Sequence, residues 1–342
     1  MSWQDILGTH WTLTEHGEAV GPENNLQGGT SAIPLPGLSQ IEVSGEDATD
    51  FLQGQFSNDI KALDDHHWQL SAYCNPKGRI LALMRITKQE HNYRLILPTE
   101  IAKGTLKRLQ MFVMRSRVTL RLCDDELLMG LAGDDLNTLV PYLSTVEHGA
   151  GHSKGMSALT MPGASLRLLV TGNSEQISKL WSECEANATG TGSGTNSMVW
   201  RQMDIESGIP QVFEASKEMF VPQMLNVDIL DGVNFKKGCY PGQEIVARMH
   251  YLGKLKKRMY LGTFKTNGSC PLPGEAVYSD SFGTQAAGNI VDAAIDANGN
   301  CSALMSVQIS SADKSDLHAE SSDGPEIILI DLPYSFPDDP DK

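Results

Sequence analysis

In the first two thirds of the chain, segments with a strand-like hydrophobic pattern are interspersed with segments that have a helical pattern. Short apolar or alternating segments, which are typical of strands, occur over residues 41–43, 80–84, 93–97, 117–123 and 166–171. Apolar residues at helical spacing predict helices over residues 48–55, 102–113, 134–143, 177–184 and 199–206. This mixture of short strands and amphipathic helices predicts an α+β body.

The pattern changes after Tyr260. Short strands are predicted over residues 259–264, 286–293, 302–309 and 326–330. Turn residues separate them, including Pro271 to Gly274 and Asn298 to Asn300. This spacing predicts a small antiparallel β-barrel at the C-terminal end, and a length of 342 residues favours two or three domains.

Composition limits the class of protein. No run of eighteen apolar residues is present, and the first 25 residues lack a basic end followed by an apolar core, so we expect neither a membrane segment nor a signal peptide. Six cysteines without a Cys-x-x-Cys pair argue against a disulfide scaffold and against a zinc site, and we expect no bound metal. We therefore expect reduced thiols and a cytoplasmic protein. Trp181 and Cys184 lie on one helical stripe and are predicted core residues.

Charge is distributed unevenly. The net charge is −15, which argues against nonspecific nucleic-acid binding by the whole surface. However, residues 236–258 contain seven Lys or Arg and one acid, and residues 103–121 contain six Lys or Arg and no acid. These two basic segments favour an anionic ligand or partner. The alternative is that both are simply solvated faces.

One eight-residue segment combines a cysteine, basic residues and a turn: Lys237-Gly238-Cys239-Tyr240-Pro241-Gly242-Gln243-Glu244. The Pro-Gly turn and the residues from Glu244 to Met249 predict that a helix begins just after Cys239. The helix dipole and the ammonium groups of Lys236 and Lys237 would favour the thiolate, so we expect a reactive cysteine. The alternative is a small buried hydrophobic residue.

This segment resembles the signature of the YgfZ family, folate-binding proteins related to the glycine-cleavage T-protein, an aminomethyltransferase. The resemblance also covers residues 51–55 with Asn58 and Asp59, and residues 73–79, 200–210 and 332–334. The motif residues that would support Cys239 are Lys237, Gly238, Tyr240, Gly242, Gln243, Glu244 and Arg248.

The resemblance implies a T-protein-like α+β fold, with two ferredoxin-like α+β domains and a C-terminal antiparallel β-barrel around a central hole. Residues 1–48 with 122–235 would form the first, discontinuous domain, and 49–121 the second. Residues 236–258 would carry the cysteine motif and connect to the barrel at 259–335.

The resemblance also implies that the cofactor is tetrahydrofolate or a derivative of it. Trp200 stands at the position of a folate-contacting tryptophan, and Glu206 at that of an acid that contacts the pterin in the T-protein. From the sequence alone, without the resemblance, the residue pattern favours a core residue at Trp200. Leu38 replaces a second folate-contacting tryptophan of the family, and its side chain can pack against a ring but cannot stack on it.

A second difference concerns activity. The T-protein has paired aspartates, one of them needed for aminomethyl transfer, where this chain has Ala82 and Leu83. This replacement argues against a classical enzyme. The resemblance instead implies support of iron–sulfur cluster assembly or repair, and thereby of tRNA thiolation, with Cys239 as the functional thiol and iron–sulfur or tRNA-modifying proteins as partners. The alternatives are a folate-dependent aminomethyl transferase and a module that binds tRNA weakly.

Overall fold

The computed structural model describes residues 1–15, 17–21, 30–133, 136, 140, 148–153, 155–187, 194–253, 255–296 and 298–336. The helix expected over 134–143 lies almost wholly outside them. The chain forms two units: Met1–Gln53, Ile60–Gln69 and Met84–Trp200 make the first, and Gly54–Asp59, Leu70–Leu83 and Arg201–Lys342 the second. Our finer division into domains stays a prediction.

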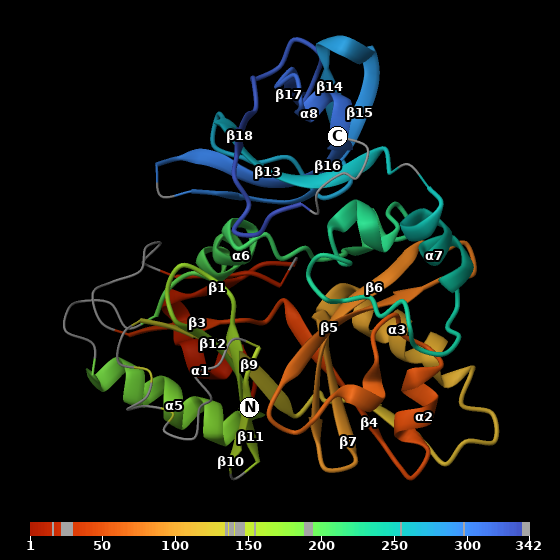
Figure 1. The fold of residues 1–342 in the computed structure, drawn as a ribbon. Coiled ribbons are helices and arrows are strands. Elements are labelled where there is room, and N and C mark those ends of the chain that lie inside the picture. Colours follow the sequence, from red (N-terminus) through yellow and green to blue (C-terminus); the bar gives the residue numbers. More distant parts are fainter. Residues whose placement is uncertain are drawn as a thin grey trace. The chain divides into compact units, whose positions relative to one another are not determined.

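The first unit contains a five-stranded antiparallel sheet in the order β10-β11-β12-β9-β3 (Figure 1). Its strands are β3 (Ser31–Pro34), β9 (Glu126–Ala132), β10 (Ala150–Ser153), β11 (Met156–Met161) and β12 (Arg167–Asn173). Around it lie helix α1 (Trp3–Leu7), the short strands β1 (Thr12–Leu13) and β2 (Ala19–Val20), and helix α5 (Ser174–Asn187). The strand predicted over 166–171 and the helix predicted over 177–184 are therefore confirmed as β12 and α5.

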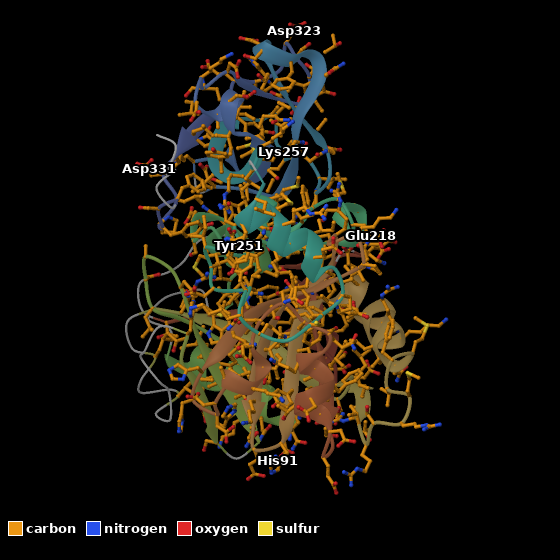
Figure 2. All side chains as sticks on the ribbon, turned by 45° about the vertical axis from the view of Figure 1, so that its right-hand side comes forward. His91, Glu218, Tyr251, Lys257, Asp323 and Asp331 are labelled. Carbon is orange, nitrogen blue, oxygen red and sulfur yellow. A yellow bond between two sulfur atoms is a disulfide. The ribbon has the colours of Figure 1, made fainter. Side chains whose placement is uncertain are left out.

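A second five-stranded sheet has the order β5-β6-β7-β4-β8. Its strands are β4 (Leu38–Ser44), β5 (Trp68–Cys74), β6 (Ile80–Gln89), β7 (Asn92–Pro98) and β8 (Thr119–Leu122). The chain passes from the first unit to the second within β5 and returns within β6. Figure 2 labels His91 in the turn that joins β6 to β7. The predicted helices are confirmed as α2 (Ala48–Gln53) and α3 (Thr99–Gln110).

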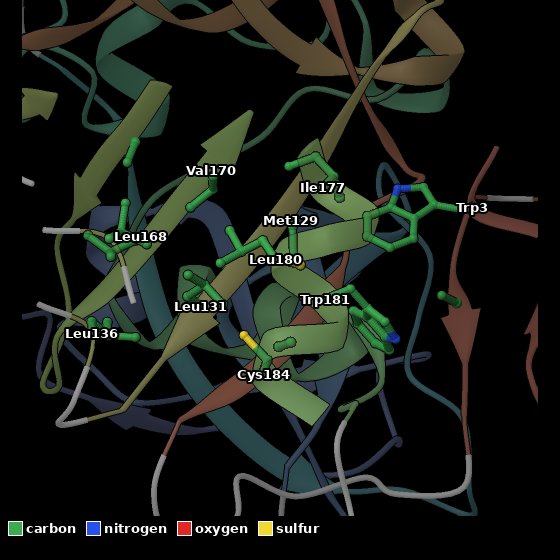
Figure 3. Packing of buried hydrophobic residues seen from close by; sticks show 14 of the residues in the cluster. Trp3, Met129, Leu131, Leu136, Leu168, Val170, Ile177, Leu180, Trp181 and Cys184 are labelled. Atoms are coloured by element: carbon green, nitrogen blue, oxygen red, sulfur yellow. The ribbon is translucent and has the colours of Figure 1, made fainter. Parts of the chain in front are cut away.

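The core of the first unit lies between the first sheet and α5. Apolar residues of β9 and β12, including Leu131 and Val170, face the α5 stripe that contains Trp181 and Cys184 (Figure 3). Trp181 meets Trp3 edge to face, with ring centroids 5.8 Å apart. The prediction that Trp181 and Cys184 are core residues is confirmed, because both are almost fully buried.

The second unit contains a six-stranded antiparallel sheet in the order β17-β14-β15-β16-β13-β18. The strands are β13 (Lys257–Lys265), β14 (Ala276–Ser279), β15 (Gly283–Ile295), β16 (Asn300–Gln308), β17 (Leu317–Ala319) and β18 (Ile328–Ile330). The sheet is curled, so that residues 325–330 contact β17 at one edge and also pair with β13 near the other edge. The amide of Ile327 donates to the carbonyl of Leu317 in β17, and β18 then pairs with β13. The predicted antiparallel C-terminal β-structure is confirmed.

The described part of the second unit also contains three α-helices: α6 (Ser197–Glu206), which begins in the first unit, α7 (Gln243–Tyr251) and α8 (Ile309–Ala312). No helix in the described part of the chain is long and apolar enough to cross a membrane.

One expectation about the thiols needs correction, because Cys270 and Cys301 form a disulfide. Their Cα atoms lie 5.6 Å apart, within the usual range for such a bond. Cys270 precedes β14 and Cys301 lies at the start of β16. Strand pairing brings them together across 31 residues, so no local motif indicates the bond.

Candidate functional site

Three segments that are far apart in the sequence pack together in the second unit. They are residues 54–59, 73–79 and 237–244, each of which belongs to a motif that the sequence analysis singled out. The ammonium of Lys237 reaches the first segment, and Gly242 contacts the second. The cysteine motif is therefore held by the two other motif segments of its own unit.

Two glycines make the close approach between the second and third segments. Gly242 has φ +84°, and a Cβ on it would lie 2.5 Å from the carbonyl oxygen of Asn75 and 2.7 Å from Cα of Gly78. Gly78 has φ +70° and lies against Ile245 of α7. The Asn75 side chain fixes this turn, because its Oδ1 accepts hydrogen bonds from the amides of Lys77 and Arg79 at 2.8 and 3.1 Å. Only glycine fits both positions without strain.

Lys237 anchors the cysteine loop. Its Nζ donates to the carbonyl oxygens of Phe56 at 2.6 Å and of Asn58 at 2.7 Å. The ammonium also lies 5.5 Å from the ring centroid of Tyr240, which is buried. Burial lowers the pKa of Lys237 to about 8, and the nearby Asp59 carboxylate opposes this shift. The sequence predicted that this cation acts on the thiol, whereas the structure binds it to backbone carbonyls.

Cys239 is an exposed free thiol, whereas the other free cysteines of the described chain, Cys74, Cys123 and Cys184, are buried. Burial raises the pKa of Cys74 and of Cys184 to about 12. Helix α7 begins at Gln243, so Cys239 precedes it by four residues, close to the prediction. The alternative that Cys239 is a buried hydrophobic residue is ruled out by its exposure.

The remaining motif residues mostly support the loop. Gln243 donates from Nε2 to the carbonyl of Lys237 at 3.5 Å, and Glu244 pairs with Arg248 one turn later at 2.9 Å. Gly238 has no heavy atom within 4 Å of the position of a Cβ.

Trp200 is enclosed in the first unit, with 2% of its surface exposed. The guanidinium carbon of Arg167 lies 4.9 Å from its ring centroid. Gly130 lies so close that a Cβ on it would be 2.4 Å from the ring. The indole Nε1 is buried and has no hydrogen-bond partner among the described residues. In this conformation Trp200 is a packing residue, and its contact with folate stays a prediction.

Glu206 is exposed at the end of α6 and accepts a hydrogen bond from Gln202 at 2.8 Å. It lines a cavity of about 470 Å³ in the second unit. Polar side chains dominate the rest of its lining, which includes Thr263, Asn300 and Ser302. The cavity therefore offers oxygen acceptors to a ligand that carries hydrogen-bond donors.

Leu38 lines a different cavity, of about 260 Å³, which is formed by residues of the first unit. Trp3 and Glu126 also line it. Burial raises the pKa of the Glu126 carboxyl, against the lowering effect of Arg94 and Arg121. The structure thus places Leu38 and Glu206 in separate cavities, and Trp200 lines neither of them.

Sequence reasoning missed a buried ion pair in the second unit. Arg201 Nε donates to Oδ1 of Asp292 at 2.6 Å, and the Asp292 side chain is fully buried. Burial raises the pKa of Asp292, and the Arg201 charge opposes the shift. A single acid within the otherwise apolar strand segment 290–294 was the signal that could have revealed it.

No protein-family model matches the chain. However, bacterial proteins named tRNA-modifying protein YgfZ are similar to it. The protein from Hamiltonella defensa is 31% identical over 258 residues, which are 72% of this chain and 74% of that protein. The one from Blochmanniella pennsylvanica is 29% identical over 257 residues, covering 72% of this chain and 76% of that protein. The chain belongs to the YgfZ family.

The fold of this YgfZ-family chain is also that of a solved enzyme structure. The glycine cleavage system aminomethyltransferase T from Bartonella henselae aligns with a TM-score of 0.75 over 96% of this chain and 95% of the enzyme. The identity is 11%, so the likeness shows a shared fold and not a shared activity. It confirms the T-protein-like fold that the resemblance implied.

In this family member Ala82 and Leu83 lie in β6 and are buried, with 0% and 4% of their surfaces exposed. Both side chains are apolar at these positions, where the resemblance implied that the T-protein's paired aspartates are replaced. They contribute to the packing of the strand and supply no carboxylate.

Proposed function

We propose that this chain is a cytoplasmic folate-binding protein that supports iron–sulfur cluster assembly or repair, and thereby the thiolation of tRNA. The observation that carries the proposal is the single exposed free thiol of the described chain, Cys239, on a loop held by two other motif segments. The names of the relatives, tRNA-modifying protein YgfZ, support the link to tRNA modification.

Cys239 is the reacting group in this proposal. A thiolate is a soft ligand that binds iron, and it can also carry sulfur as a persulfide. Within the described residues, no group of three or more His, Cys, Asp or Glu side chains is arranged to hold a metal ion. A cluster bound at Cys239 would therefore need its remaining ligands from a partner protein, which fits a role in transfer between proteins.

Lys237 and Gly242 have a positioning role. Lys237 lies two residues before Cys239, and its ammonium binds carbonyl oxygens in the 56–58 segment. Gly242 lies three residues after Cys239 and packs closely against the carbonyl oxygen of Asn75. Both ends of the loop are fixed while Cys239 stays exposed. Such an arrangement presents the thiol to a macromolecular partner rather than enclosing it in a small-molecule pocket.

The residues fit folate in part. Bound tetrahydrofolate would supply a reduced pterin ring that carries one-carbon groups. The Glu206 carboxylate is exposed in a cavity of about 470 Å³, which is in the size range of ligand pockets, and it could accept a donor pair from a pterin edge. Leu38 could pack against a ring. Trp200 would have to exchange its contact with Arg167 for a ligand.

The alternative of an aminomethyl transferase is disfavoured, because buried Ala82 and Leu83 offer no group for proton transfer. A turnover assay with the other glycine-cleavage components separates the two functions. Aminomethyl transfer to tetrahydrofolate would support the alternative.

The decisive test is Cys239→Ser in cells that rely on this variant alone, with thiolated tRNA nucleosides measured by mass spectrometry. We expect thiolation to be lost, because a hydroxyl is a poor soft-metal ligand and cannot carry sulfur. The matched control is Cys184→Ala, which removes a buried thiol and should keep thiolation. Wild-type thiolation in the Cys239→Ser cells would overturn the thiol-centred mechanism.

Folate binding is tested separately by titration of purified variants with tetrahydrofolate. Glu206→Gln keeps one acceptor and loses the charge, so we expect a moderate loss of affinity. Trp200→Ala should weaken binding by about 1–3 kcal/mol, provided that the variant is folded. Unchanged affinity in both folded variants would place the folate site elsewhere.

A further inference from the structure

Three aromatic rings gather beside the cysteine loop in the second unit. The rings of Phe235 and His250 are stacked, with centroids 3.8 Å apart and an angle of 12° between their planes. Tyr251 meets His250 edge to face at 4.7 Å and Phe235 at 6.1 Å. Tyr251 is 63% exposed and stands at the end of α7, where Figure 2 labels it. Leu252, the next residue, is 86% exposed.

The chain segments that carry these rings are also rich in positive charge. Lys236 and Lys256 are exposed, and neither they nor Lys257 forms an ion pair with a described residue. Lys257 is half-buried, and both burial and the positive charge of Arg79 lower its pKa. Glu244, the only acid between residues 236 and 258, is already paired with Arg248. The chain as a whole has a net charge of −15, so this excess of positive charge is a property of the 236–258 segment.

The combination is unlike an ordinary surface. Single exposed hydrophobic residues are common in soluble proteins, but here the exposed side chains of His250, Tyr251 and Leu252 belong to a segment, residues 236–258, that also carries the exposed Lys236 and Lys256. Aromatic faces bind unpaired bases by stacking, and nearby Lys or Arg side chains bind the phosphates that join those bases. A duplex keeps its bases stacked on each other and offers no free face to Tyr251.

We propose that the surface formed by Phe235, Lys236, His250, Tyr251, Leu252 and Lys256, called here the α7-end surface, binds a single-stranded segment of RNA. Phe235 and Cys239 are four residues apart, so their Cα atoms lie within about 14 Å of each other. This bound keeps the Phe235 side of the surface near the loop that carries Cys239. That this RNA is a loop of tRNA rests on the proposed function, whereas the binding surface itself does not.

The first test measures fluorescence anisotropy with a labelled single-stranded RNA of about 12 nucleotides and with the duplex of the same sequence. We expect the full-length protein to prefer the single strand. Tyr251→Ala should weaken binding roughly 5- to 150-fold, the range found for the loss of one stacked base. Because Tyr251 is exposed at a helix end and Ala is a good helix former, the variant should fold normally.

Charge variants separate phosphate binding from stacking. In titrations between about 50 and 200 mM salt, the slope of affinity against salt decreases in magnitude by about 0.7 for each single-strand phosphate that the protein no longer neutralises. Lys236→Gln and Lys256→Gln should each reduce the slope in this way, whereas Tyr251→Ala should leave it unchanged.

The other basic segment supplies matched controls. Phe112 is 43% exposed, next to Met111 and Met114, and Lys107 is exposed on α3. Phe112→Ala and Lys107→Gln should bind RNA like the wild type. If only Phe112→Ala and Lys107→Gln lose RNA binding, the RNA binds the 103–121 segment and the proposal is wrong. Absence of RNA binding by the wild-type protein would overturn it in favour of a protein partner.

The two proposals can fail independently. Cys239→Ser should bind RNA with wild-type affinity, because a thiol contributes neither a stacking face nor a positive charge. If Tyr251→Ala binds RNA normally while Cys239→Ser abolishes thiolation, the α7-end surface is wrong and the proposed function stands. If Tyr251→Ala loses RNA binding while Cys239→Ser retains thiolation, the reverse holds.

Discussion

Replacement of Gly242 by alanine should test how the cysteine loop is built. Gly242 has φ +84°, and a Cβ at this position would lie 2.5 Å from the carbonyl oxygen of Asn75 and 2.7 Å from Cα of Gly78. Both neighbours are backbone atoms, so no side-chain rotation can relieve the overlap. Gly238, four residues earlier in the same motif, has no heavy atom within 4 Å of the place that a Cβ would occupy, and its φ is not positive.

The expected magnitude has two parts. A non-glycine residue in the left-handed region costs about 1–2 kcal/mol. Forcing a methyl group into a packed site that must shift costs about 1–3 kcal/mol more. We therefore expect Gly242→Ala to lower the free energy of unfolding of the second unit by about 2–5 kcal/mol. Gly238→Ala should stay within about 0.5 kcal/mol of the wild type.

The assay is equilibrium unfolding in guanidinium chloride, with the midpoint compared at unchanged slope. Iodoacetamide labelling of Cys239 below the transition gives a second measurement, because a shifted turn should change access to the thiol in Gly242→Ala and not in Gly238→Ala. Equal midpoints for Gly242→Ala and the wild type would refute the account of the turn. So would an equal loss of stability in the two variants.

Three further outcomes follow from the burial and charge of single groups. Iodoacetamide should alkylate the exposed Cys239 faster than the buried Cys184, and comparable rates by peptide mass mapping would contradict the placement of these thiols. Arg201→Met leaves the Asp292 carboxylate buried without its cation, so unfolding experiments should show a loss of about 3–5 kcal/mol, and a loss below about 1 kcal/mol would argue against a structural pair. Burial lowers the pKa of Lys237 to about 8 from 10.5, so above pH 8 the folded chain binds fewer protons than the unfolded chain. Wild-type stability should then rise relative to Lys237→Met between pH 8 and 10.5, and a constant difference would contradict this.

The sequence predicted those parts of the fold that follow a local period. The stripe containing Trp181 and Cys184 makes α5 one face of a core, and the apolar run after Gly78 becomes β6. The alternating segments after Tyr260 become β13, β15 and β16 because each presents one face to the core of the curled sheet. Burial of one face imposes such periods, so they can be read without the structure.

Long-range contacts could not be predicted in this way. The α7-end surface depends on Phe235 from a loop stacking on His250 from a helix, and no spacing rule encodes that contact. The same holds for the partners of Lys237: a lysine near a cysteine suggests activation of the thiol, but two backbone carbonyls some 180 residues away in sequence bind its ammonium. The sequence also could not decide the environment of Trp200, because a large ring suits both a core and a ligand site, and the structure places it in a core.

The cysteine motif is therefore mostly scaffold. Lys237 binds two carbonyls, Tyr240 is buried near the Lys237 ammonium, and Gly242 and Gln243 close the turn that begins α7. Each of these residues has a contact that explains its type without reference to chemistry. Cys239 is different, because its exposed thiol makes no such contribution to packing. A loop that uses its other side chains to hold one exposed thiol in place is suited to reaction with a partner, and this division of roles is the strongest structural support for a thiol-centred function.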